Sequence, residues 1–162
     1  MHHPSAKSAD SIENVINRYG DSLYRLCLIL LKNESDAEDA LQETMIQYYR
    51  KAPAFSDEEH EKAWLITVAT NKCRDMLRFR ARHPQLDTDF LPDTLPESPD
   101  CGILDALASL PEKYRLVLTL HYIEEYAIAE IAKTIRKSPS AVKMRLMRGR
   151  KLLEEIYRKE YL

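Results

Sequence analysis

The sequence is poor in glycine and cysteine, and this excludes several classes of binding site. Its 162 residues include three glycines, all far apart, whereas phosphate loops and dinucleotide fingerprints need glycines a few residues apart. The three cysteines, at positions 27, 73 and 101, form no CxxC pair and no Cys/His cluster of the kind that binds zinc. We therefore expect reduced thiols in a cytoplasmic protein, with no metal and no cofactor.

Long apolar runs and catalytic patterns are also missing. No stretch approaches the roughly 18 apolar residues that span a bilayer, and residues 1–10 lack the apolar run of a signal peptide. The five histidines show no HExxH spacing, and the sequence contains no GxSxG. We expect a globular protein that does not insert into membranes and is not an enzyme.

Charge is divided unevenly along the chain, although the net charge is only −2. Residues 62–83 carry six basic side chains and one acidic, and residues 113–162 carry twelve basic and six acidic. By contrast, residues 1–61 carry twelve acidic side chains and six basic, and residues 84–112 carry seven acidic and none basic. Separate basic blocks are typical of a protein that binds a polyanion, although any one of them could be a solvated helix face.

Apolar periodicity predicts helices along the whole chain and no strands. Between residues 23 and 31 the apolar side chains follow the spacing of one buried helical stripe. A second helix is predicted to begin at Ser35, which forms a capping box with Glu38, and to end before Pro53. Ser56 and Glu59 offer a capping box for a third helix, whose last turns are strongly basic.

An acidic, proline-rich segment separates two helical parts. Residues 84–102 contain four prolines and no basic residue, which disfavours both a helix and a central strand. We expect this segment to link an N-terminal domain of residues 1–83 to a C-terminal domain of residues 103–162. The predicted fold is all-α, with two small helical domains joined by the acidic Pro-rich linker.

The C-terminal domain contains a predicted helix-turn-helix. A short helix ends near Ile135, and after a break of about three residues Ser138 and Pro139 begin another as N-cap and first-turn proline. Between Lys133 and Lys151 there are eight basic residues and no acidic one. Such a helix is suited to the major groove of DNA, because its cations neutralise phosphates and arginine can pair with guanine. The alternative is a surface helix that is merely solvated.

Two further stretches carry a functional signal. The basic segment 72–82 lies near Trp64 and Phe79, and cations beside aromatic rings suit melted, single-stranded DNA. Trp64 could equally belong to the core. The acidic segment 34–43 would be repelled by phosphate, so we expect it to face a basic protein surface or solvent.

These blocks, in this order, resemble the extracytoplasmic-function (ECF) group of bacterial sigma factors. Residues 35–55 (SDAEDALQETMIQYYRKAPAF) are similar to the polymerase-binding helix of that family, and residues 61–82 (EKAWLITVATNKCRDMLRFRAR) to its promoter-melting helix. Residues 107–153 are similar to its promoter-reading domain. The resemblance implies a subunit that binds RNA polymerase core and directs promoter-specific transcription initiation. Its implied partners are RNA polymerase core, promoter DNA and an anti-sigma factor.

The resemblance also implies roles for individual residues. Those that would contact the clamp helices of the largest polymerase subunit are Asp36, Asp39, Gln42 and Glu43. The loop 54–61 would capture a base flipped from the minus-ten element, and the implied minus-ten contacts are Phe55, Ser56, Trp64, Asn71, Lys72, Arg74, Asp75 and Arg78. The implied minus-thirty-five contacts are Ser138, Ser140, Lys143, Met144, Arg145, Met147 and Arg148.

The sequence departs from the family pattern in the helix-turn-helix. Arg136 stands where a turn glycine is common, and Lys137 where an apolar residue is usual. A left-handed residue other than glycine costs about 1 kcal/mol or more, which predicts a distorted turn and weaker minus-thirty-five binding. The alternative function is therefore a sigma-like interaction protein that binds polymerase or an anti-sigma partner but reads DNA poorly. An ordinary helix-turn-helix repressor is a third possibility.

Overall fold

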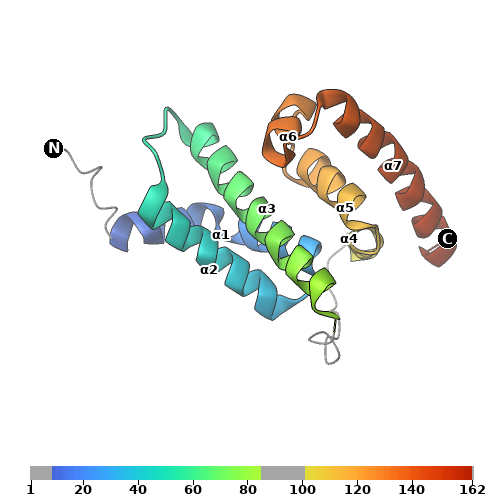
Figure 1. Ribbon diagram of the computed structural model, residues 1–162, viewed down its shortest axis with the longest axis horizontal. Helices are drawn as coiled ribbons and strands as arrows, with labels where there is room; N and C mark the ends of the chain where they lie inside the picture. Colours follow the sequence, from blue (N-terminus) through green and yellow to red (C-terminus); the bar gives the residue numbers. More distant parts are fainter. Residues whose placement is uncertain (1–8, 85–100, 162) are drawn as a thin grey trace. The chain divides into compact units, whose positions relative to one another are not determined.

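A computed structural model describes residues 9–84 and 101–161 of the chain. Within these residues every element is helical and there is no strand, which confirms the predicted fold class (Figure 1). The chain forms two compact units, with the division between Leu91 and Pro92. The predicted linker lies almost entirely outside the described residues. Its last two positions belong to a helix, which begins at Cys101, two residues earlier than expected.

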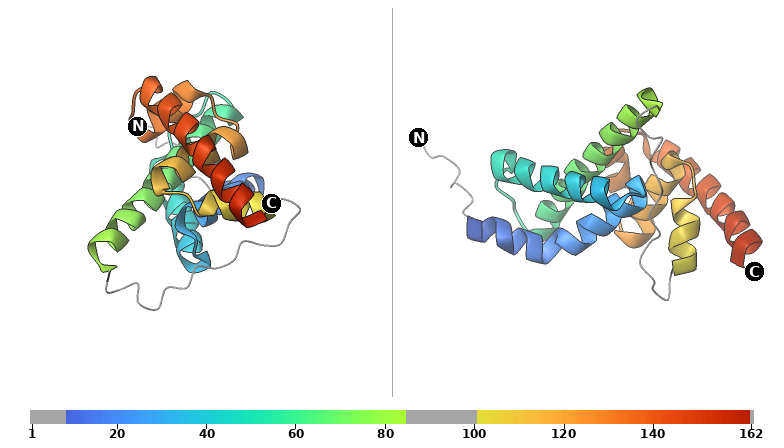
Figure 2. Two further views of the ribbon diagram at one scale, coloured as in Figure 1. Left: turned by 90° about the vertical axis from the view of Figure 1, so that its right-hand side faces the viewer. Right: turned by 90° about the horizontal axis from the view of Figure 1, so that it is seen from below.

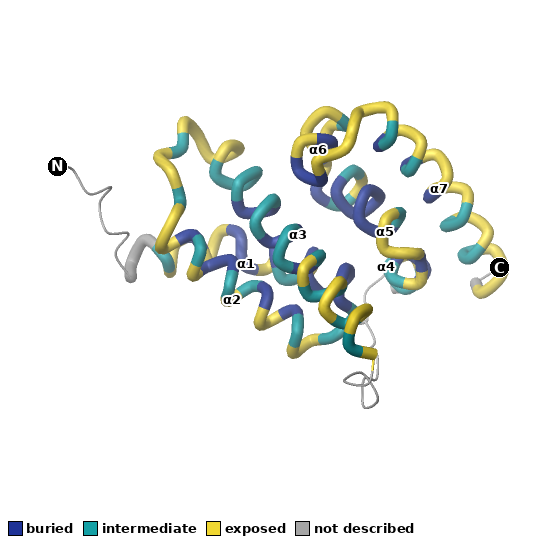
Figure 3. Tube along the Cα trace, in the orientation of Figure 1, coloured by how far each residue is buried: buried dark blue, intermediate teal, exposed yellow. Residues whose placement is uncertain are grey.

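The first unit consists of three helices that pack against one another. They are α1 (Ala9–Leu31), α2 (Glu34–Lys51) and α3 (Glu58–Arg82), and each contacts the other two (Figures 1 and 2). The stripe predicted for residues 23–31 belongs to the core: Leu26 and Ile29 are fully buried, as is Leu65 of α3. Figure 3 shows the buried residues of this unit in dark blue. Burial of this stripe fixes which faces of α2 and α3 remain available to a partner.

The helix caps of this unit differ from the predicted ones. Lys32 adopts a left-handed conformation (φ 58°) that ends α1, and Asn33 then caps α2 by accepting a hydrogen bond from the Asp36 amide at 2.8 Å. The predicted cap Ser35 therefore lies inside the first turn. In α3 the cap is Asp57, which accepts from the amide of His60 at 2.7 Å. A carboxylate also interacts favourably with the positive end of the helix dipole, so Asp57 is preferred to Ser56.

The second unit is built around one long helix. α4 (Cys101–Ala108), α5 (Glu112–Leu118) and α6 (Ile128–Ile135) all pack on α7 (Pro139–Tyr161). α5 continues directly into a π-helical turn, η2 (Thr119–Ile123). A Cβ on Gly149 would lie 3.1 Å from Leu118 Cδ1 and 3.2 Å from Tyr114 Cβ, so a side chain here would press on α5, and glycine allows the close approach of α7 to α5.

Among the described residues, no helix combines the length and the apolar character that a membrane crossing requires.

Candidate nucleic-acid and protein interfaces

The turn between α6 and α7 is regular despite its unusual residues. Arg136 has φ 57° and ψ 47°, the ideal left-handed conformation, and the Lys137 amide donates to the carbonyl of Ala132 at 3.0 Å. The expected left-handed conformation is therefore present, but the expected distortion is not. The Arg136 side chain is exposed.

The beginning of α7 agrees with the sequence prediction. Ser138 Oγ accepts a hydrogen bond from the amide of Ala141 at 3.1 Å, and Pro139 is the first helical residue. Val142 and Leu146 are buried and attach this helix to the second unit. The side chains of the predicted minus-thirty-five contacts are exposed except for Arg145, which is half-buried; the exposed ones are Ser138, Ser140, Lys143, Met144, Met147 and Arg148.

The loop between α2 and α3 carries an aromatic cluster. The ring of Phe55 stacks on Tyr48, with centroids 6.1 Å apart and planes 16° apart, and meets Trp64 edge-on at 6.0 Å. His60 contacts the other edge of Phe55, with centroids 5.2 Å apart. Trp64 is half-buried, so the structure places it both against the core and beside the loop. Ser56 is exposed, and its amide donates to His60 Nδ1 at 3.2 Å.

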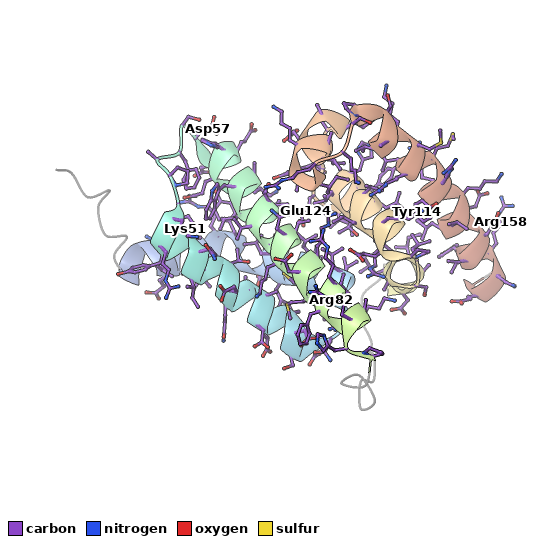
Figure 4. The ribbon with its side chains drawn as sticks, in the orientation of Figure 1. Lys51, Asp57, Arg82, Tyr114, Glu124 and Arg158 are labelled. Carbon is purple, nitrogen blue, oxygen red and sulfur yellow. The ribbon has the colours of Figure 1, made fainter. Side chains whose placement is uncertain are left out.

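This loop bounds an open pocket of about 390 Å³. Figure 4 labels Lys51 and Asp57, which stand at the two ends of the loop. The pocket lining combines aromatic and aliphatic surface with carboxylates, and includes no basic residue: it consists of Tyr48, Pro53, Ala54, Phe55, Asp57, Glu58 and Glu61. A flat ring can enter such a pocket, whereas a phosphate group would be repelled by it.

Hydrogen bonds and ion pairs hold the acidic side of the pocket. The Tyr48 hydroxyl donates to Glu61 Oε2 at 2.6 Å. Burial raises the pKa of Tyr48, and the hydrogen bond to Glu61 raises it further, so the hydroxyl remains a donor. Arg18 of α1 lies 3.3 Å from Glu58 Oε1 and 3.8 Å from Glu61 Oε1. It supplies positive charge to these two carboxylates and does not itself line the pocket.

The predicted minus-ten residues of α3 share one side of the helix. Trp64, Asn71, Asp75 and Arg78 follow at intervals of seven, four and three residues, which places them along one stripe. The flanking positions are Lys72 and Arg74, and both are half-buried. Arg78 and Asp75 are exposed and form an ion pair at 3.3 Å. The buried stripe, centred on Ala69 and Cys73, lies on the opposite side of the helix.

The acidic helix α2 has a solvent-facing side opposite its buried stripe. Asp39 and Gln42 are exposed and Glu43 is half-buried. Asp36 already has a partner within the chain: it forms an ion pair with Arg80 of α3, and Arg80 also donates to the carbonyl of Leu31 at 3.0 Å. This pair joins the beginning of α2 to the end of α3.

Two residues on the outer side of α2 were missed in the sequence. Ile46 and Tyr49 are 42% and 56% exposed, and they follow Gln42 at intervals of four and three residues. Their spacing in the sequence could have indicated their exposure, because both lie off the helical stripe of buried residues that contains Ala40, Thr44 and Tyr48.

Within the ranges that the structure describes, no three His, Cys, Asp or Glu side chains are grouped so that they could hold a metal ion.

Comparison with known proteins assigns both units. Residues 15–83 match the model for Sigma-70 region 2, and residues 102–153 match the model for Sigma-70, region 4. The chain is 29% identical over 165 residues to the ECF RNA polymerase sigma factor SigW of Bacillus subtilis, covering 90% of this chain and 88% of that protein. It is 31% identical over 159 residues to the ECF sigma factor SigE of Mycolicibacterium smegmatis, covering 90% of this chain and 61% of that protein.

A solved structure shows the same fold. The sigma factor RpoE in complex with the anti-sigma factor NepR, from Bartonella quintana, covers 94% of this chain and 99% of its own, with 21% identity and a TM-score of 0.77. Both sigma-70 regions are thus present in order, and ECF sigma factors are similar to the chain over nine-tenths of its length. The chain belongs to the ECF group of RNA polymerase sigma factors, a family of generally non-enzymatic regulators of transcription initiation.

Proposed function

We propose that this sigma factor divides its work between three surfaces. The outer side of α2 binds the polymerase core, the loop at Phe55 and the exposed stripe of α3 hold the opened minus-ten element, and α7 reads the minus-thirty-five element. In domain terms, residues 1–83 bind core and melt DNA, residues 103–162 read duplex DNA, and residues 84–102 link them.

The observation that carries the proposal is the helix-turn-helix, whose second helix carries only basic charges as far as Lys151. From Lys133 to Lys151 the chain carries eight basic residues and no acidic one. The side of α7 that contains Val142 and Leu146 is buried, so most of these cations are left on the exposed sides. The regular turn at Arg136 supports full minus-thirty-five binding, since α6 and α7 meet without distortion.

The minus-ten role rests on the combination of pocket and stripe. The pocket next to Phe55 offers aromatic walls and hydrogen-bond acceptors but no cation, which suits a flipped base better than a phosphate. Lys72 and Arg74, on the flanks of the stripe that begins at Trp64, supply cations for the backbone of the separated strand.

The core-binding role rests on the exposed part of α2. Asp39, Gln42 and Glu43 offer acceptors to a basic surface, and Ile46 adds an exposed apolar side chain between them and the loop. We propose that Asp36 contributes mainly by orienting α2, because its carboxylate is paired with Arg80.

The proposed partners determine where in the cell the protein works. RNA polymerase works in the cytoplasm, so we place the protein there, without catalytic activity of its own. Because the RpoE structure contains the anti-sigma factor NepR, we propose that an anti-sigma factor also masks surfaces of this chain.

Run-off transcription tests the proposal. Purified chain and bacterial core polymerase are incubated with a pool of genomic promoter fragments, and we expect specific transcripts that core alone does not produce. The double variant Lys143→Ala with Arg148→Ala should lose most of them. Arg158→Ala is the matched control, since Arg158 lies nearly three turns beyond Arg148 on α7 and pairs with Glu154 at 2.6 Å. Stable core binding without promoter-dependent transcripts would instead favour the interaction protein that reads DNA poorly.

A further inference from the structure

Two methionines occupy the centre of the exposed side of α7. Met144 and Met147 are 42% and 55% exposed. A helix turns about 100° per residue, so Met144 lies about 200° and Met147 about 140° around the axis from the buried Val142. The two thioethers therefore point away from the core of the unit. Residues three apart on a helix are neighbours, so these side chains form one small apolar surface.

The surroundings of this apolar surface are cationic. Lys143 and Arg148 flank the methionines on either side, Lys151 lies one turn further along, and all three are exposed. No carboxylate occurs in the sequence between Arg136 and Lys151. A partner that fits must therefore be anionic at its edges and must offer apolar groups between the anions.

The major groove of duplex DNA has this chemistry. Phosphates line its rims, and the thymine C5-methyl is the apolar group that base pairs expose on its floor. A helix that presented only Lys and Arg could bind phosphates and guanine, but it would gain nothing from a thymine methyl. A methionine fits this task because its unbranched thioether adapts to the shape of an apolar surface.

We propose that Met144 and Met147 read thymine methyl groups in the minus-thirty-five element, while Lys143 and Arg148 position α7 on the groove. The proposal rests on the proposed minus-thirty-five role of α7. It assigns specificity to the two apolar side chains and affinity to the cations. Removal of one methyl contact is expected to weaken binding about three- to fourfold, the equivalent of one buried methylene group.

The experiment removes the methyl group from the DNA and the thioether from the protein separately. Full-length chain bound to core polymerase selects duplexes from a pool randomised in the minus-thirty-five region. Each selected thymine is then replaced by deoxyuridine, which lacks only the C5-methyl, and affinity is measured by fluorescence anisotropy. The same duplexes are measured with Met144→Ala and Met147→Ala. Ile103→Ala is the control, because Ile103 is 41% exposed on α4 of the same unit.

Two results together would support the proposal. With the native chain, at least one thymine should show a three- to fourfold loss on replacement by deoxyuridine. That loss should disappear in Met144→Ala or Met147→Ala and persist in Ile103→Ala.

The contrary results are equally definite. Deoxyuridine without effect at every selected position, or a selected element without thymine, would overturn the reading of methyl groups. So would methionine variants that keep the deoxyuridine effect but lose binding to an anti-sigma protein, because the apolar surface would then serve a protein partner. Failure of the proposed function itself looks different: the holoenzyme would select no minus-thirty-five element at all.

Discussion

The exposed sides of α2 and α7 both combine two apolar side chains with charged ones, but the charges are mainly acidic on α2 and basic on α7. Each has two exposed apolar side chains, Ile46 and Tyr49 in the last turns of α2 and Met144 and Met147 in the first half of α7. From position 34 to 49 α2 carries five acidic residues and no basic one, and Arg50 and Lys51 then end the helix, whereas α7 carries only basic charges up to position 151. In the proposed function, the apolar side chains supply contact area and the sign of the charge on the same helix selects the partner. An acidic helix is compatible with a basic protein and a basic helix with DNA.

Reversal of the charges on α7 or on α2 should produce the largest effect and tests the difference between the two helices most directly. Lys143→Glu with Arg148→Glu should weaken promoter binding by the holoenzyme at least a hundredfold, about 3 kcal/mol, because two attractive contacts with phosphate become repulsive. Binding to core polymerase should not change. The mirror variant, Asp39→Lys with Glu43→Lys, should weaken core binding instead. Anisotropy titrations with core and with promoter DNA measure both, and loss of core binding in the Lys143→Glu with Arg148→Glu variant would refute the separation of roles.

A larger side chain at Gly149 should destabilise the second unit and leave the stability of the first unit unchanged. A valine there would force its side chain against Leu118 and Tyr114, which lie 3.1–3.3 Å from the position of a Cβ. We expect the second unit to lose about 1–3 kcal/mol of stability. The only tryptophan, Trp64, lies in the first unit, so urea unfolding followed by its fluorescence should remain unchanged while circular dichroism shows an earlier transition. An earlier fluorescence transition would mean that the units do not unfold independently.

The anchoring of α2 can be tested at Arg80. Its side chain is 16% exposed, pairs with Asp36 and donates to the Leu31 carbonyl, so Arg80→Ala should destabilise the first unit by about 1–2 kcal/mol. Arg78→Ala is the matched control, because the Arg78–Asp75 pair is largely exposed and should contribute well under 1 kcal/mol. Urea midpoints read from Trp64 fluorescence measure both. Equal midpoints for the two variants would show that the Arg80 contacts do not anchor α2.

The smallest expected effect concerns the left-handed turns. Arg136→Gly removes a Cβ from a left-handed residue and should stabilise the second unit by up to about 1 kcal/mol. Lys32→Gly, at the corresponding left-handed position in the first unit, should have a similar effect there. Thermal unfolding measured by calorimetry compares the two. A loss of stability for Arg136→Gly would mean that the arginine side chain contributes to the turn.

Local sequence signals predicted the helices well and their ends less well. Spacing alone identified the buried stripe of α1, and Ser138 with Pro139 identified the beginning of α7, because both depend on near neighbours in sequence. The predicted caps at Ser35 and Ser56 were wrong, since Asn33 and Asp57 are competing caps one or two residues away.

Features that depend on distant residues were not predictable in this way. The ion pair between Asp36 and Arg80 joins residues 44 positions apart, and nothing in either segment indicates it. The π-helical turn at Thr119–Ile123 contacts both α5 and α6, and apolar spacing alone did not indicate it. The roles assigned to individual residues in contacting polymerase, the minus-ten element and the minus-thirty-five element remain predictions.

The burial of the cysteine and methionine side chains affects how the protein reacts with peroxide. Cys27 and Cys73 are fully buried in the first unit, so peroxide does not reach their thiols. The thioethers of Met144 and Met147 are open to solvent on α7, and their sulfoxides are polar. Peroxide would therefore oxidise α7, the helix that we propose reads duplex DNA, before it oxidised the buried thiols of the first unit, and methionine sulfoxide reductases could reverse the change.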